Sequence, residues 1–232
     1  MKIKGLDLSI TEQFIILQLT GNKFIKNKKV KIGDSKIYVL ASILVDLSLN
    51  DKISFDGNQE ITIKDAGLTG IEYNDIVLNL IKSKGVISLK KCTQYFYLHS
   101  KLLKNIYNSI IESVIKKGAL EVKKIDSFFS TSKKAYVDSK KVGDLLIQKL
   151  RIDLLENGNM DMDTMYLAIL LDSNKTLMSY FSEYEYSIIN DKMKTIYQKD
   201  ESNKFKIMKK SINNIEAISI LNLVIDIISS FI

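Results

Sequence analysis

The chain has 232 residues, of which 46% are hydrophobic and 26% charged, values typical of a globular protein that buries a sizeable core. Its net charge of +7 favours an anionic partner: nucleic acid, an acidic membrane surface or an acidic protein. Arg151 is the sole arginine, and because phosphate and base recognition favour arginine, the lysine excess is equally consistent with a surface that has no specific partner.

Apolar periodicity and stop signals predict a mainly α fold with short β-hairpins, organised as one domain over residues 1–232. Ser9 and Glu12 form a capping box that opens the first helix. Residues 37–49 are apolar on nearly all sides and predict a buried second helix. The turn residues Asp, Gly and Asn between ISF and EITI predict a hairpin.

Further helices follow along the chain. They are expected over EYNDIVLNLIKSKG, from Ser88 to His99, and over 101–117, 139–156, 161–172, 174–181, 183–198 and 206–231. The segments LSLNDKISF, LIKSKGVISL and VIKKGALEV each end a helix and lead into a short strand. We interpret this as the usual closure of a helix by a left-handed residue and not as a repeat fold.

Neither end of the chain predicts a membrane anchor. MKIKGLDLS lacks the apolar region of a signal peptide. Residues 215–232 are apolar but carry Glu216, Asn222 and Asp226, so we expect a buried core helix there and not a transmembrane span. The expected location is cytoplasmic, with any membrane contact peripheral.

The side-chain combinations of common catalytic and metal sites are missing. The sequence has no P-loop, no GxGxxG, no HExxH and no paired CxxC. Cys92 is the sole cysteine, which excludes an internal disulfide, and the sole histidine, His99, offers it no oriented base. Asp161 and Asp163 are expected to cap a helix. We therefore expect no enzymatic activity, no cofactor and no metal site.

The stretch from Lys101 to Val137 is the most informative part of the sequence. A helix with an apolar stripe stops at Gly118, and a hairpin follows with Phe128 and Phe129 at or near its tip. Neighbouring strand side chains point to opposite faces, so one of the two phenylalanines must face away from the body. Lysines beside an exposed apolar tip favour a membrane surface or another subunit.

Two alternatives remain open. Residues 9–63 have the helix, helix, hairpin outline of a winged helix, with lysines available for phosphate contacts at Lys26, Lys28, Lys29, Lys31 and Lys36. The helix over 37–49 would have to read bases, but it is apolar, so we do not expect a nucleic-acid partner. In the other alternative the chain is an oligomeric protein-binding scaffold whose subunits meet through the hairpin.

The order and spacing of several segments resemble the Golgi phosphoprotein 3 family over nearly the whole chain. They are LSITEQFIILQL, ASILVDLSLNDKISF with EITI, the SLKK segment, VIKKGALEVKK with the hairpin, and MDTMYLAILLDSNKTLMSYF. The resemblance implies a mainly helical core with one protruding hairpin. It also implies a peripheral membrane protein that binds an anionic phospholipid headgroup of the phosphatidylinositol 4-phosphate type.

The resemblance assigns site residues one by one. The family's two helix arginines fall near Lys104 and Tyr107, its tryptophan near Lys31 and its N-terminal arginine near Leu40. We expect headgroup contacts at Lys101, Lys104, Tyr107 and Lys31. The family's hairpin serves membrane contact and self-association, which implies these roles for Phe128, Phe129, Lys133 and Lys134.

Overall fold

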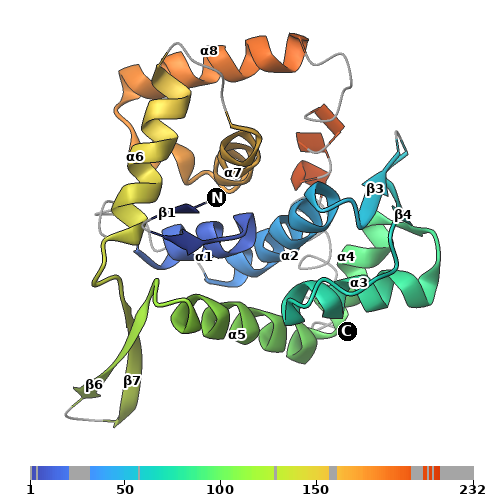
Figure 1. Ribbon diagram of the computed structural model, residues 1–232, viewed down its shortest axis with the longest axis horizontal. Helices are drawn as coiled ribbons and strands as arrows, with labels where there is room; N and C mark the ends of the chain where they lie inside the picture. Colours follow the sequence, from blue (N-terminus) through green and yellow to red (C-terminus); the bar gives the residue numbers. More distant parts are fainter. Residues whose placement is uncertain are drawn as a thin grey trace, which may run out of the picture.

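The computed structural model describes residues 2–3, 5–20, 32–56, 58–127, 130–156 and 161–199, and seven residues between 206 and 214. The described chain is mainly α-helical with small antiparallel strand pairs, as predicted (Figure 1). The helices are α1 (Ile10–Thr20), α2 (Ile32–Leu49), α3 (Glu72–Lys84), α4 (Leu89–Leu98), α5 (Ser100–Lys116), α6 (Val142–Leu155), α7 (Met162–Ser173) and α8 (Glu183–Lys199). Among the described residues, no helix combines the length and apolar character needed to cross a bilayer.

Three small sheets connect these helices. Their strands are β1 (Lys2–Ile3), β2 (Leu6–Asp7), β3 (Ile53–Phe55), β4 (Glu60–Ile63), β5 (Ile87–Ser88), β6 (Glu121–Ser127) and β7 (Ser130–Val137). The predicted β3–β4 hairpin is confirmed, and β5 adds to β4 as a third strand. The β1–β2 pair was not predicted. It turns at Gly5, whose φ of 78° is a conformation that glycine adopts without steric cost.

The core lies around α1, α2 and α7, whose apolar runs leave no polar stripe. Residues 10–17 of α1 and 37–47 of α2 are buried without interruption. α1 packs against α2, α5, α6 and α7, and α2 packs against α3, α4 and α7. Figure 1 shows α6 and α8 on one side of this centre and α3, α4 and α5 on the other.

Left-handed residues end three of the helices, as the sequence predicts. Asp51, Gly85 and Gly118 have φ values of 53°, 67° and 70°, and each precedes a strand: β3, β5 and β6 respectively. Because a left-handed residue breaks the helical path, the chain turns sharply into the strand.

Several predicted boundaries were wrong. α2 begins at Ile32, five residues before the expected start. α6 begins at Val142, since the carboxylate of Asp138 accepts hydrogen bonds from the backbone N–H of Val142 and of Gly143, both at 2.7 Å. The helix expected over 174–181 is a single 3₁₀ turn, η2 (Leu177–Tyr180), because Lys175 adopts φ 57° and ends α7. Of the last expected helix, residues beyond 214 lie outside the described part.

α5 leads directly into the β6–β7 hairpin, which projects from the helical body as predicted (Figure 1). The strands have seven and eight residues, so the hairpin reaches about 25 Å. α5 lies along the edge of the body from which the hairpin projects, and α8 lies along the opposite edge.

Candidate functional site

α5 presents two charged side chains to solvent in its first turn, at the end of the helix away from the hairpin. Its apolar residues Leu103, Ile106, Ile110 and Val114 are buried, which turns the opposite face outward. Lys101 and Lys104 lie on the exposed side, and neither forms an ion pair with another described residue. Their ammonium groups are therefore available to an anion.

Tyr107 differs from these lysines in its surroundings. It is half-buried and packs against the hydrophobic core. Burial raises the pKa of its phenol, and Tyr136 of β7 adds to the increase. Tyr107 thus supplies no charge to an anion at this surface. The position assigned to the family's second arginine cannot bind phosphate through an ion pair here.

The remaining expected site residues are only partly described. Lys31, Phe128 and Phe129 lie outside the described residues. Lys133 and Lys134 belong to β7, where the register pairs them with Ile125 and Lys124. Leu40, the position of the family's N-terminal arginine, is buried in α2 and cannot contact a ligand at the surface.

The net charge of the chain is concentrated in one stretch of the sequence, which runs from α3 through α4 into α5. Between Ile76 and Ile111 there are six lysines and no aspartate or glutamate. We call this segment the acid-free stretch. The other 28 basic residues are nearly balanced by all 27 acids, so this stretch of 36 residues carries +6 of the net +7. Two acids outside the stretch interact with it: Glu72 accepts a hydrogen bond from Ser109 at 2.8 Å, and the carboxylate of Asp65 interacts electrostatically with Lys82. Interpretation of the sequence motif by motif did not detect this lack of acids, which a count of aspartate and glutamate along the chain reveals.

All six lysines of this stretch are exposed, and none forms an ion pair with a described acid. Lys82 donates to the carbonyl of Ala66 at 2.6 Å, and the ammonium of Lys84 lies 5.8 Å from the centre of the Tyr95 ring. The other four are Lys90, Lys91, Lys101 and Lys104. The positive charge of this stretch is therefore exposed to solvent and is not neutralised by salt bridges to described acids.

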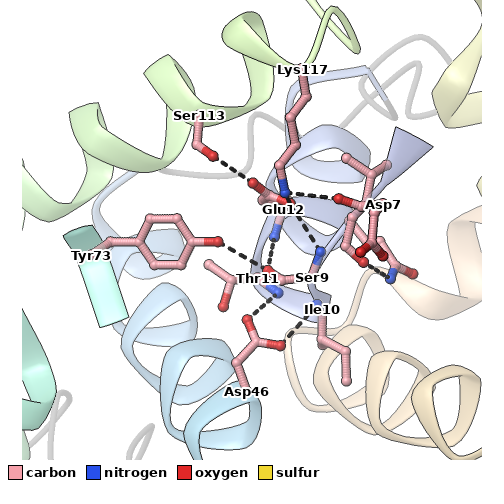
Figure 2. A network of polar contacts seen from close by, with 11 residues as sticks. Asp7, Ser9, Ile10, Thr11, Glu12, Asp46, Tyr73, Ser113 and Lys117 are labelled. Carbon is pink, nitrogen blue, oxygen red and sulfur yellow. Dashed lines mark hydrogen bonds and ion pairs between the residues drawn. The ribbon is translucent and has the colours of Figure 1, made fainter. Parts of the chain in front are cut away.

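A buried polar network fixes the far end of α5 (Figure 2). Glu12 is fully buried, and its carboxylate accepts hydrogen bonds from Ser113 and from the ammonium of Lys117, both at 2.6 Å. Lys117 also donates to the carbonyl of Asp7 at 2.8 Å. Since Lys117 immediately precedes the turn at Gly118, these contacts fix the chain where it leaves α5 for the hairpin.

The same network holds the start of α1. Glu12 accepts a hydrogen bond from the backbone N–H of Ser9 at 2.9 Å, and Ser9 Oγ accepts one from the N–H of Glu12 at 3.2 Å, which confirms the predicted capping box. The carboxylate of Asp46 accepts from the N–H groups of Ile10 and Thr11 at 2.9 and 3.1 Å. Burial raises the pKa of Asp46, and the hydrogen bonds from α1 oppose that increase.

Cys92 and His99 do not form a pair suited to nucleophilic catalysis. Cys92 is fully buried, and burial raises the pKa of its thiol to about 12, so it stays protonated near neutral pH. His99 is exposed and stacks on Tyr95, with ring centres 4.0 Å apart. Within the described residues, no group of three or more His, Cys, Asp or Glu side chains could hold a metal ion.

The acidic helix starts have the capping geometry that the sequence predicts. Asp161 Oδ1 accepts a hydrogen bond from the N–H of Asp163 at 3.3 Å, and its other oxygen lies 3.0 Å from the ammonium of Lys149. Ser182 and Glu185 form a capping box at the start of α8. These carboxylates are used in structural contacts.

The burial of α2 argues against the winged-helix alternative. Residues 37–47, which would have to enter a DNA groove, are buried in the centre of the fold. Lys26, Lys28, Lys29 and Lys31 lie outside the described residues, and of Lys36 only the backbone is described. The part of α2 that a recognition helix would expose therefore offers no side chain to a base edge.

Comparison of the chain with protein-family models gives no matching family, and a search of curated proteins gives no similar sequence.

Proposed function

We propose that this chain is a peripheral, non-enzymatic protein of the Golgi phosphoprotein 3 type that binds anionic lipid surfaces through α5 and the β6–β7 hairpin. The observation that carries the proposal is the run of exposed lysines without ion pairs. It ends in the first turn of α5, and the other end of this helix leads to a hairpin that projects from the body. Each lysine near an acidic bilayer contributes about 1 kcal/mol, and this attraction falls with added salt.

The hairpin supports the same assignment. It is two-stranded among the described residues, and an isolated pair of strands is marginally stable in water. Burial of Phe128 and Phe129 in the acyl boundary would add about 3–5 kcal/mol. Lysines and an apolar tip together give two weak attachments, which suffice for reversible membrane binding.

The chemistry of α5 favours general attraction to anionic headgroups over recognition of one species. Lys104 is a point charge without the bidentate geometry of arginine, and Tyr107 is uncharged and half-buried. We therefore expect phosphatidylinositol 4-phosphate and phosphatidylserine to bind the protein in proportion to vesicle charge.

Co-sedimentation with vesicles at low salt tests the proposal. Wild type is expected to pellet with acidic vesicles and to be released by salt. A variant with alanine at Lys101, Lys104, Phe128 and Phe129 is expected to stay in the supernatant. A matched control, Lys64→Ala/Lys194→Ala, removes two exposed lysines outside α5 and the hairpin and should pellet like wild type. If the four-residue variant pellets as well as wild type, the proposal is wrong.

The open strands favour a second candidate function, self-association through the hairpin. Both β6 and β7 have one edge without a partner strand among the described residues, and such edges pair readily with another chain. Light scattering of wild type and of Phe128→Ser/Phe129→Ser measures this. A fall in mass without loss of vesicle binding would assign the hairpin to an oligomer and leave lipid contact to α5.

A further inference from the structure

The outward face of α4 combines charged and apolar side chains. Leu89, Cys92, Thr93 and Phe96 are buried on one side of this helix. Lys91, Tyr95 and Leu98 follow at intervals of four and three residues, so they form a stripe on the other side. Leu98 is 75% exposed, a large apolar surface to leave in water.

Aromatic contacts connect this stripe to the end of α3. The ammonium of Lys84 lies over the ring of Tyr95, and Tyr95 stacks on His99 at the end of α4. Val86, two residues after Lys84, is 59% exposed. We use the name α4 patch for the surface formed by Lys84, Val86, Lys91, Tyr95, Leu98 and His99.

The α4 patch lies within the acid-free stretch, so no acid of its own segment neutralises its lysines. An acidic bilayer matches both of its components, because apolar side chains enter the acyl boundary while lysines reach the phosphates beside it. A nucleic-acid duplex would use the lysines but leave Leu98 and Val86 in water. The composition therefore favours a lipid surface.

We propose that the α4 patch is a second membrane-contact element that docks on an acidic bilayer together with the hairpin. This inference rests on the proposed function. α5 begins at Ser100, directly after the patch, and ends before the hairpin. Its 17 residues separate the two contacts by about 25 Å. Two linked contacts bind more tightly than either alone and fix the orientation of the protein on the membrane.

A fluorescent probe at residue 98 tests the contact locally. Cys92 is fully buried, so a Leu98→Cys variant carries a single accessible thiol for an environment-sensitive fluorophore. Its emission is expected to shift to the blue with vesicles of phosphatidylcholine and phosphatidylserine, and to stay unchanged with phosphatidylcholine alone. Tyr184→Cys is the matched control, since Tyr184 is 77% exposed and lies on α8 at the opposite edge of the fold. Its emission should not shift.

A binding measurement complements the probe. Leu98→Ser/Lys91→Gln changes only exposed side chains and is expected to weaken co-sedimentation by about tenfold, the equivalent of 1.4 kcal/mol. If wild type pellets but this variant binds equally and the probe stays in water, the α4 patch is not a contact and the proposed function stands. If wild type does not pellet, both proposals fail. A probe shift with duplex DNA and none with vesicles would overturn the lipid assignment.

Discussion

The ammonium nitrogen of Lys117 lies 2.6 Å from a carboxylate oxygen of Glu12, a residue 105 positions earlier in the chain. Glu12 is fully buried, whereas the Lys117 side chain keeps 35% of its surface in contact with solvent. This ion pair joins the end of α5 to the start of α1. A contact with the buried helix α1 therefore fixes the point at which the chain leaves the body for the hairpin.

Removing the lysine should destabilise the protein strongly. In a Lys117→Ala variant the Glu12 carboxylate stays buried without its counter-charge, which costs 3–5 kcal/mol for fully buried pairs. We expect a loss of about 2–3 kcal/mol in the free energy of unfolding, because Lys117 is partly solvated. Urea unfolding measures the change. Lys116→Ala, which removes an exposed neighbour, is the control and should stay within about 0.5 kcal/mol of wild type. Equal stabilities of the two variants would show that the pair contributes nothing.

Asp46 should make the protein less stable as the pH rises. Its pKa in the folded state is raised above the ordinary value of 3.8, so the folded protein binds this proton more tightly than the unfolded chain does. The resulting stability is complete below pH 3.8 and is lost as the pH rises through the folded pKa. Asp46→Asn cannot titrate. Its stability relative to wild type should therefore increase as the pH rises above 3.8.

Urea unfolding of both proteins at several pH values tests this prediction. Asparagine keeps one acceptor oxygen, whereas the carboxylate accepts from both Ile10 and Thr11, so Asp46→Asn also carries a constant penalty. That penalty does not change with pH. A difference in unfolding free energy that is flat across this range would contradict the raised pKa.

Local chemistry made part of this fold predictable. Capping boxes predict helix starts, because each pair of side chains satisfies free backbone groups within one turn. The two pairs are Ser9 with Glu12 and Ser182 with Glu185. Gly85 and Gly118 predict helix ends, because glycine readily adopts the positive φ that breaks the helical path. Such signals act over a few residues, and the sequence displays them directly.

Long-range contacts set the features that were missed. Asp46 caps α1 from 36 residues away, and Lys117 pairs with Glu12, which lies 105 residues earlier in the chain. Nothing near either residue in the sequence specifies its partner. Tyr107 shows the same limit at the candidate site, since the effect of Tyr136 of β7 on its pKa depends on how the hairpin packs. The acid-free stretch, in contrast, is a property of the sequence alone. It is found by plotting the positions of aspartate and glutamate along the chain, and a search for motifs does not reveal it.

Replacing Arg151 by lysine should lower the stability of the protein. Its guanidinium donates to the carbonyl of Tyr180 at 2.8 Å, pairs with Glu185 and lies 5.1 Å from the centre of the Phe181 ring. These contacts join α6 to η2 and α8. A lysine cannot form all of them, because it lacks the planar fork.

We expect Arg151→Lys to lower the free energy of unfolding by about 1–2 kcal/mol, the size of a lost charge-assisted hydrogen bond. Chemical denaturation measures the loss. The reverse exchange at an exposed site, Lys194→Arg, should change stability by less than about 0.5 kcal/mol. An Arg151→Lys variant as stable as wild type would show that only the charge matters.

Cys92 should resist thiol reagents in the folded protein. It is fully buried in α4, and burial raises its pKa to about 12, so the thiolate is both inaccessible and rare at neutral pH. An aromatic disulfide reagent that releases a coloured thiol is expected to react with wild type only in denaturant. Leu98→Cys, with its thiol on the outward stripe of the same helix, should react at once with one equivalent. Rapid reaction of native wild type would mean that α4 opens readily from the core, and the α4 patch would then lack the rigid support on which its outward stripe depends.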